Sequence, residues 1–252
     1  SGRTVMSNLH AMFSVGAMAG AASTGAMLRA GVDAKVQLAA IGIATAVAVA
    51  LAARWMLEVH PAPADDEPQQ HFAWPRGPLL VIGLMIFAGM SAEGAMYDWC
   101  VLYLKQEVRL SQDVAAMGYA AFTAAMAAAR FGGDALRTRF SERHLLRASA
   151  GLSAVAMAVV LVSGNAVVSI AGYALVGAGL APVVPILFNA ATRVPGVSRA
   201  AAIAAVSSIG YSGFMIGPPL IGSLAQAVSL TAAMWVVVFA SALLAIGARK
   251  VG

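Results

Sequence analysis

Long apolar runs separated by short polar clusters make up most of the chain. Each run could cross a bilayer core of about 30 Å, which takes about 20 helical residues. The runs are too long for membrane β-strands, and they lack the alternation of apolar and polar residues that such strands show. The pattern therefore predicts eight membrane-spanning helices, over residues 5–28, 36–57, 78–104, 113–135, 144–163, 166–191, 199–226 and 229–248.

The connection over residues 58–77 differs from the other connections. It contains four prolines and the acidic run Asp65-Asp66-Glu67. Such a segment cannot bury itself, so we expect a mobile, polar, cytoplasmic loop. It divides the chain into residues 1–57, with two predicted helices, and residues 78–252, with six. Because the chain begins Ser1-Gly2-Arg3 and enters a span almost at once, we also expect it to be truncated at its amino end.

Composition narrows the fold class to an all-α membrane protein, a polytopic helical bundle. Of the 252 residues, 60% are hydrophobic and 11% charged, against about 45–50% and about 25% in soluble domains. The single cysteine, Cys100, excludes a disulfide scaffold. The four histidines lie far apart in no metal-ligand spacing, so no metal site is expected. The many glycines and alanines in the spans predict close helix packing.

The basic residues predict the orientation of the chain in the membrane. If its amino end is cytoplasmic, the loops and ends on that side carry 12 of the 16 lysines and arginines, and the opposite side carries 4. The positive-inside rule selects this orientation, with both ends of the chain in the cytoplasm. The excess of basic residues therefore indicates membrane topology, and we expect no nucleic-acid partner.

Glu93 is the residue that composition explains least. It lies about 3 Å from the midplane of the span over residues 78–104, where a charged side chain costs about 2.5–3.5 kcal/mol. We therefore expect it to face a cavity, to pair, or to hold a proton, which makes it a candidate proton carrier. The alternative is a carboxyl group that ties two helices together. Tyr97 shares its helix face, whereas Asp98, turned by about 140°, is expected at the outer vestibule or against a neighbouring helix.

Further polar residues and prolines are candidates for the transport pathway. His10 opens the first span and is either a structural residue or a proton-coupling group. Asn189 lies near the cytoplasmic end of the sixth span. Prolines interrupt helices and free backbone carbonyls, and such interruptions often mark a transporter's binding region. We expect helix kinks at Pro182, Pro185, Pro218 and Pro219.

Residues 130–140 join the fourth and fifth predicted spans. Two glycines would permit a tight turn, and several arginines would clasp the end of a neighbouring helix. This segment is a candidate cytoplasmic gate loop, and topogenic charge is the alternative interpretation. The candidate gate residues are Arg130, Gly133, Asp134, Arg137 and Arg139.

Nothing in the sequence indicates an enzyme or a cofactor. No G-x-x-x-x-G-K-[ST] motif is present, which excludes ATP hydrolysis by a P-loop in this chain. Gly210-Tyr211-Ser212-Gly213 resembles the motif of rhomboid-type intramembrane proteases. In that family the histidine base comes from a later helix, and here no histidine follows His144.

The chain resembles the major facilitator superfamily, specifically bacterial permeases of the fucose-permease-like kind. The resemblance rests on residues 3–14 (RTVMSNLHAMFS), residues 93–99 (EGAMYDW), residues 133–139, Pro182 to Pro185 and Gly217 to Pro219. Residues 133–139 are similar to the superfamily's signature cytoplasmic loop. Ser141 departs from that signature, which usually has glycine there.

The resemblance implies a twelve-helix fold of two six-helix bundles joined by a long cytoplasmic loop. The eight predicted spans would be family helices five to twelve, and the missing amino-terminal helices would belong to the same parent chain in a bacterial inner membrane. We expect a secondary transporter that works by alternating access, with a small polar solute such as a sugar, protons and the lipid bilayer as partners. Proton-coupled symport is expected, with an efflux antiporter and a non-transporting scaffold as alternatives.

Overall fold

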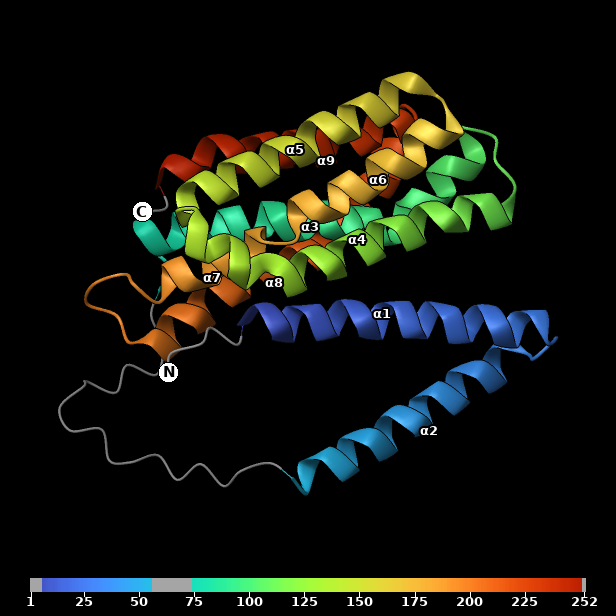
Figure 1. Cartoon of the computed structure of the whole chain (residues 1–252), viewed down its shortest axis with the longest axis horizontal. Helices are drawn as coiled ribbons and strands as arrows, with labels where there is room; N and C mark the ends of the chain where they lie inside the picture. Colours follow the sequence, from blue (N-terminus) through green and yellow to red (C-terminus); the bar gives the residue numbers. More distant parts are fainter. Residues whose placement is uncertain (1–5, 56–73, 251–252) are drawn as a thin grey trace. The chain divides into compact units, whose positions relative to one another are not determined.

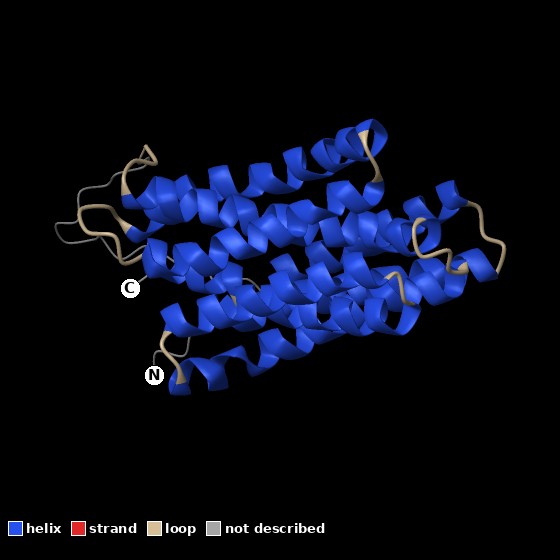
Figure 2. Ribbon diagram, turned by 90° about the horizontal axis from the view of Figure 1, so that it is seen from above, coloured by secondary structure: helices blue, strands red, loops and turns tan. Residues whose placement is uncertain are grey.

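The computed structural model describes residues 6–55 and 74–250, in which the regular elements are nine α-helices and one short 3-10 helix (Figure 1; Figure 2). The helices are α1 (Met6–Arg29), α2 (Ala34–Ala53), α3 (Pro78–Gln106), α4 (Gln112–Arg139), α5 (Glu142–Ser163), α6 (Ala166–Leu180), α7 (Val183–Ala191), α8 (Arg199–Ala227) and α9 (Leu230–Gly247), followed by η1 (Ala248–Lys250).

The helices confirm the all-α membrane fold that the hydrophobic pattern predicts. In the described part of the chain, seven segments are long and apolar enough to cross a membrane, and α6 and α7 together form one of them. Helix α1 has 24 residues but is not among the seven. Of the predicted linker over residues 58–77, only residues 74–77 lie within the described residues.

Polar side chains cap the starts of α5, α6, α8 and α9. Ser141, Ser198 and Ser229 each accept a hydrogen bond from a backbone N–H in the first turn of α5, α8 and α9. The Asn165 side chain accepts two such bonds, from Val167 and Val168 of α6. These caps satisfy backbone donors that a helix start otherwise leaves without partners.

The chain divides into two compact units. One unit, Gly16–Pro68, contains most of α1 and all of α2. Asp33 caps α2 by accepting from the backbone N–H of Lys35, and Gln37 donates to the carbonyl of Val32 at 2.7 Å, which fixes the turn between the two helices. The other unit contains the remaining residues, and its main part is the bundle α3–α9.

Helix α3 forms the centre of the bundle. It packs along α8 and also contacts α9, α4 and α7, while α5 packs against α6 and α9 (Figure 1). As a result, 78% of the most apolar stretch of α3 is buried, against 39% for α4, α5, α8 and α9. A polar residue in the middle of α3 is therefore enclosed by protein.

Glycines allow the closest helix contacts in the bundle. A Cβ at Gly213 of α8 would come within 2.6 Å of the backbone oxygen of Phe87 on α3. A Cβ at Gly177 of α6 would collide with the backbone oxygen of Phe122 on α4. Both contacts are with backbone atoms, which cannot swing aside, so these positions confirm the expected small-residue packing.

The predicted span over residues 166–191 consists of two helices. Helix α6 ends at Leu180, and α7 begins at Val183 after a buried turn at Ala181 and Pro182. Pro182 has no N–H to continue the ladder of α6, whereas Pro185 lies in the first turn of α7, where no intrahelical bond is lost. At the first proline, where a kink was expected, the helix is thus broken completely. Helix α8, in contrast, remains continuous through Pro218 and Pro219.

The prediction that residues 130–140 form a loop is wrong. Helix α4 continues to Arg139, and the connection to α5 consists of Phe140 and Ser141 only. Gly132 therefore lies inside a helix and makes no tight turn. The arginines of this segment favour the extension, because basic residues at a helix's last turn interact well with its dipole.

Candidate functional site

Glu93 lies at the centre of the bundle, on the buried face of α3. Its exposed fraction is 4%. The residues on either side of it in the sequence, Ala92 and Gly94, are buried as well, and Gly94 packs against Phe214 of α8. The Glu93 carboxyl group is therefore enclosed by helices.

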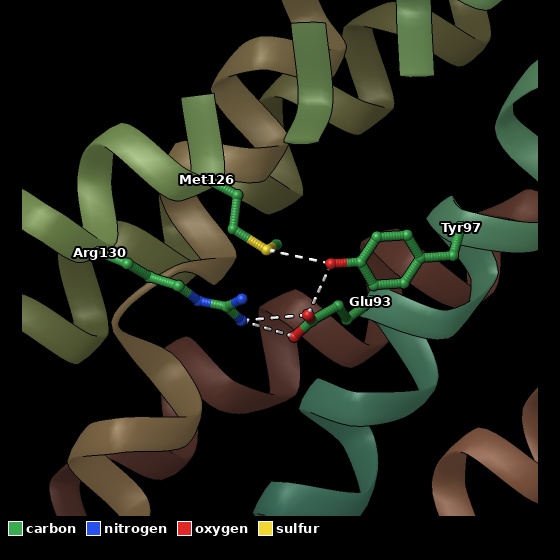
Figure 3. A network of polar contacts seen from close by, with 4 residues as sticks. All are labelled: Glu93, Tyr97, Met126 and Arg130. Carbon is green, nitrogen blue, oxygen red and sulfur yellow. Dashed lines mark hydrogen bonds and ion pairs between the residues drawn. The ribbon is translucent and has the colours of Figure 1, made fainter. Parts of the chain in front are cut away.

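Arg130 of α4 is the partner of this carboxyl group. Its Nη2 atom donates to both carboxylate oxygens of Glu93, at 3.0 Å to Oε1 and 3.1 Å to Oε2 (Figure 3). Arg130 is itself only 2% exposed, so both charges are removed from water. Hydrogen bonds between charged groups are stronger than neutral ones, and this attraction offsets part of the desolvation cost.

A signal for this pair is present in the sequence, but the prediction of a gate loop missed it. Arg130 falls inside the predicted span over residues 113–135, and a basic residue inside a span calls for a partner. Glu93 lies 13 residues before the end of α3, and Arg130 lies 18 residues after the start of α4. These separations correspond to about 20 Å and about 27 Å from the connecting loop. The long arginine side chain covers the difference.

Tyr97 extends the pair toward the surface of the bundle. Its hydroxyl donates to Oε1 of Glu93 at 3.2 Å and lies 3.7 Å from the Met126 sulfur (Figure 3). Its ring contacts Phe122 edge-on at a centroid distance of 5.5 Å. The side chains of Glu93 and Tyr97 thus share a helix face, as expected. Tyr97 is half-buried, whereas Glu93, Met126 and Arg130 are buried.

Asp98 does not belong to this cluster. It is exposed and makes no ion pair with any residue that the structure describes. The expectation that Glu93 and Asp98 do not share a face agrees with this placement. The alternative expectation, that Asp98 pairs with a neighbouring helix, finds no support within the described residues.

Asn189 belongs to a second polar cluster, away from Glu93. Its side-chain amide donates to Oε1 of Glu142 at 2.6 Å, and Arg193 forms an ion pair with the other carboxylate oxygen. Glu142 is the first residue of α5, and Asn189 lies near the end of α7. The structure therefore does not bring Asn189 together with Glu93. This cluster joins a helix start to a helix end.

The remaining candidates are placed only in part. The side chains of His10 and Asp134 lie outside the described residues, although both positions are helical. Gly133 is buried, Arg137 is half-buried and Arg139 is exposed. Among the candidate gate residues whose side chains are described, Arg130 and Gly133 are thus the buried ones.

Comparisons with known proteins agree with this architecture. The sequence profile of the Major Facilitator Superfamily matches residues 3–196 and also residues 81–251. An uncharacterized MFS-type transporter of Yersinia pestis is 33% identical over 251 residues, which is 100% of this chain and 65% of that protein. The membrane protein MosC of Rhizobium meliloti is 32% identical over 91% of this chain and 56% of its own length. The chain thus spans less than two-thirds of these relatives.

Solved structures show the same fold. The crystal structure of the fucose:proton symporter FucP of E. coli aligns with a TM-score of 0.64 at 19% identity, over 70% of this chain and 43% of that one. A structure of FucP in the outward conformation aligns with a TM-score of 0.63. The sequence profile and the relatives agree with this fold, and the chain belongs to the Major Facilitator Superfamily.

Proposed function

We propose that the protein is a secondary transporter that couples the movement of a small polar solute to protons, with Glu93 as the proton-accepting group. The observation that carries this proposal is the buried pair of Glu93 and Arg130 in the bundle core. Ionisable residues inside membrane segments often mark substrate and proton pathways.

Protonation of Glu93 would change the conformation of the bundle, because the net charge of the Glu93–Arg130 pair depends on whether Glu93 carries a proton. With Glu93 ionised, the two charges compensate each other. When Glu93 takes up a proton, the buried Arg130 loses the attraction of the Glu93 carboxylate, which is unfavourable. The bundle then favours an arrangement in which Arg130 reaches water or an acceptor on the solute. Proton binding thus shifts a two-state equilibrium, as coupled transport requires.

Tyr97 supports this role because it lies between the pair and the bundle surface. Its hydroxyl donates to Glu93, and Tyr97 is the half-buried residue of the cluster. A proton reaching Glu93 along this side would pass the tyrosine hydroxyl, which can both donate and accept a hydrogen bond.

We also propose that both ends of the chain lie in the cytoplasm. Because Arg130 is buried in the bundle, it no longer counts among the loop charges. Without it, the predicted cytoplasmic side still carries 11 basic residues against 4, so the positive-inside rule gives the same orientation.

The experiment is a proton-flux measurement on the intact protein in proteoliposomes, with solutes added one at a time. Sugars are tested first, because FucP, which shares the fold, is a fucose:proton symporter. We expect one solute to drive proton entry and Glu93→Gln to abolish it. Asp98→Asn is the matched control, since it neutralises an exposed carboxyl group on the same helix.

Three outcomes would decide between the alternatives. Proton flow opposite to the solute would identify an antiporter, which uses the same carboxyl group. Coupling lost in Asp98→Asn but kept in Glu93→Gln would move the proton site to the exposed carboxyl group. No flux with any solute, and no binding of any solute by thermal shift, would favour a membrane scaffold.

A further inference from the structure

A groove opens between the end of α4 and the start of α5. It has a volume of about 720 Å³, within the about 300–1,000 Å³ that is typical of small-molecule sites. Leu136 and Phe140 line it from α4, and both are exposed. Along α5 it reaches Gly151, where an added Cβ would meet no atom within 4 Å. The groove is therefore open and mainly apolar.

One end of the groove is cationic. Arg147 and His144 line it, and Arg143 lies one turn before Arg147 on the same face of α5. Arg143 and Arg147 are exposed and make no ion pair with the described residues. The nearest acidic residue of α5, Glu142, is already engaged by Asn189 and Arg193. The positive charge at this end thus has no described counter-ion.

The groove also lies where a membrane surface would meet the helices. Leu136 and Phe140 lie at the end of α4, which reaches Arg139, and the lining residues of α5 run from His144 to Gly151. Gly151 lies nine residues after the start of α5 at Glu142, which corresponds to about 14 Å along the helix. In a bilayer spanned by α5, the basic residues of the groove would thus lie nearer to the lipid headgroups than Ala148 and Gly151.

A second groove in the bundle lacks the basic lining residues of the α4–α5 groove. It lies between α5 and α6, has a volume of about 370 Å³, and is lined by apolar residues and glycine alone, such as Val155, Val159 and Leu175. It offers an acyl chain a surface but offers a headgroup no charge. Of these two grooves, the α4–α5 groove is the one with basic residues that could select a lipid by the charge of its headgroup.

From this juxtaposition we propose that the α4–α5 groove is a binding site for one acidic phospholipid. The phosphate lies against Arg147 and His144, and an acyl chain runs from there along α5, past Ala148, toward Gly151. A ligand that is anionic at one end and apolar along its length matches both parts of the groove, whereas a polar solute matches only its cationic end. The proposal does not depend on proton coupling at Glu93.

The test is native mass spectrometry of the intact protein titrated with phosphatidylglycerol or phosphatidylcholine of equal chain length. We expect phosphatidylglycerol to bind more tightly, and Arg147→Gln to weaken that binding about five-fold, the effect of one basic residue near an anionic lipid. Arg199→Gln is the matched control, because Arg199 is an exposed residue at the start of α8. It should leave the affinity unchanged.

A second variant tests the acyl-chain part of the groove. Gly151→Leu places a side chain in the open space without changing charge, and we expect it to weaken phosphatidylglycerol binding as well. Inorganic phosphate at millimolar concentration should not displace the lipid. Equal affinity for the two lipids, equal loss in Arg147→Gln and Arg199→Gln, or displacement by free phosphate would each overturn the proposal.

Discussion

At the scale of single residues, the pair of Glu93 and Arg130 is the feature with the largest energetic consequence. Its two side chains are 4% and 2% exposed, so neither charge has water as an alternative partner. In such a pair the loss of one member costs more than the loss of both, because one member alone remains buried and uncompensated.

We predict that Arg130→Gln lowers the free energy of unfolding by about 3–5 kcal/mol, since it leaves the Glu93 carboxylate without its cation. The double variant Glu93→Gln/Arg130→Gln should recover more than half of that loss. Unfolding of the intact protein in mixed micelles of rising dodecyl sulfate content measures both. Strictly additive effects of the two substitutions would show that the side chains do not interact.

Two substitutions at Tyr97 separate the contribution of its hydrogen bond to stability from that of its ring contacts. Tyr97→Phe removes the hydroxyl bound to Glu93 and should cost about 1 kcal/mol. Tyr97→Ala also removes the edge contact with Phe122 and should cost more. The control is Tyr211→Phe, because Tyr211 is 58% exposed and its hydroxyl makes no hydrogen bond with the described residues. A loss in Tyr211→Phe equal to that in Tyr97→Phe would contradict this account.

At the scale of helices, the hydrophobic pattern predicted which segments are helical but not how their ends behave. The spans over residues 78–104 and 199–226 agree with α3 and α8 to within two residues at each end. The end of α4 was missed, because charged residues after an apolar run were interpreted as a loop although they also favour a helix's last turn. A kink was predicted at Pro182, because the effect of proline on a helix is local, and the structure divides α6 from α7 there.

The contact between α3 and α8 supplies a prediction about helix packing. Gly213→Ala adds a methyl group 2.6 Å from the backbone oxygen of Phe87, so the helices must separate. Overpacking of this kind costs about 1–3 kcal/mol. Gly151→Ala is the control, since nothing lies within 4 Å of its added Cβ and it should be neutral or stabilising. Thermal unfolding in detergent compares the two, and equal melting temperatures would refute the close contact.

At the scale of the whole molecule, the two units differ in how much apolar surface they bury. Only 6% of the most apolar stretch of α2 is buried, against 78% for α3. We therefore predict that residues 1–252 aggregate in detergent more readily than residues 74–252, which contain α3–α9 without α2, because the exposed apolar surface of α2 favours association. Size-exclusion chromatography measures this, and a monodisperse, cooperatively melting monomer of this chain would contradict it.

The fold was predictable from sequence because membrane helices can be recognised by the length and hydropathy of their apolar segments. The candidate site was predictable only in part. Glu93 and Tyr97 were found from the rarity of a midplane carboxyl group and the helical repeat. The contact of Glu93 with Arg130 depends on how α3 and α4 pack, and that of Asn189 with Glu142 on how α5 and α7 pack. The sequence shows that Arg130 needs a partner, because it lies inside a span, but it does not show which residue of another helix is that partner.

Comparing uphill accumulation of a solute with its equilibrium exchange, in wild type and in Glu93→Gln, tests the coupling role of Glu93 most directly. Exchange needs solute binding and a folded, moving protein, whereas accumulation also needs a proton to be carried. We predict that Glu93→Gln keeps exchange and loses accumulation driven by a pH gradient. Accumulation that persists at the wild-type level in Glu93→Gln would contradict the proposal and leave Glu93 a structural partner of Arg130.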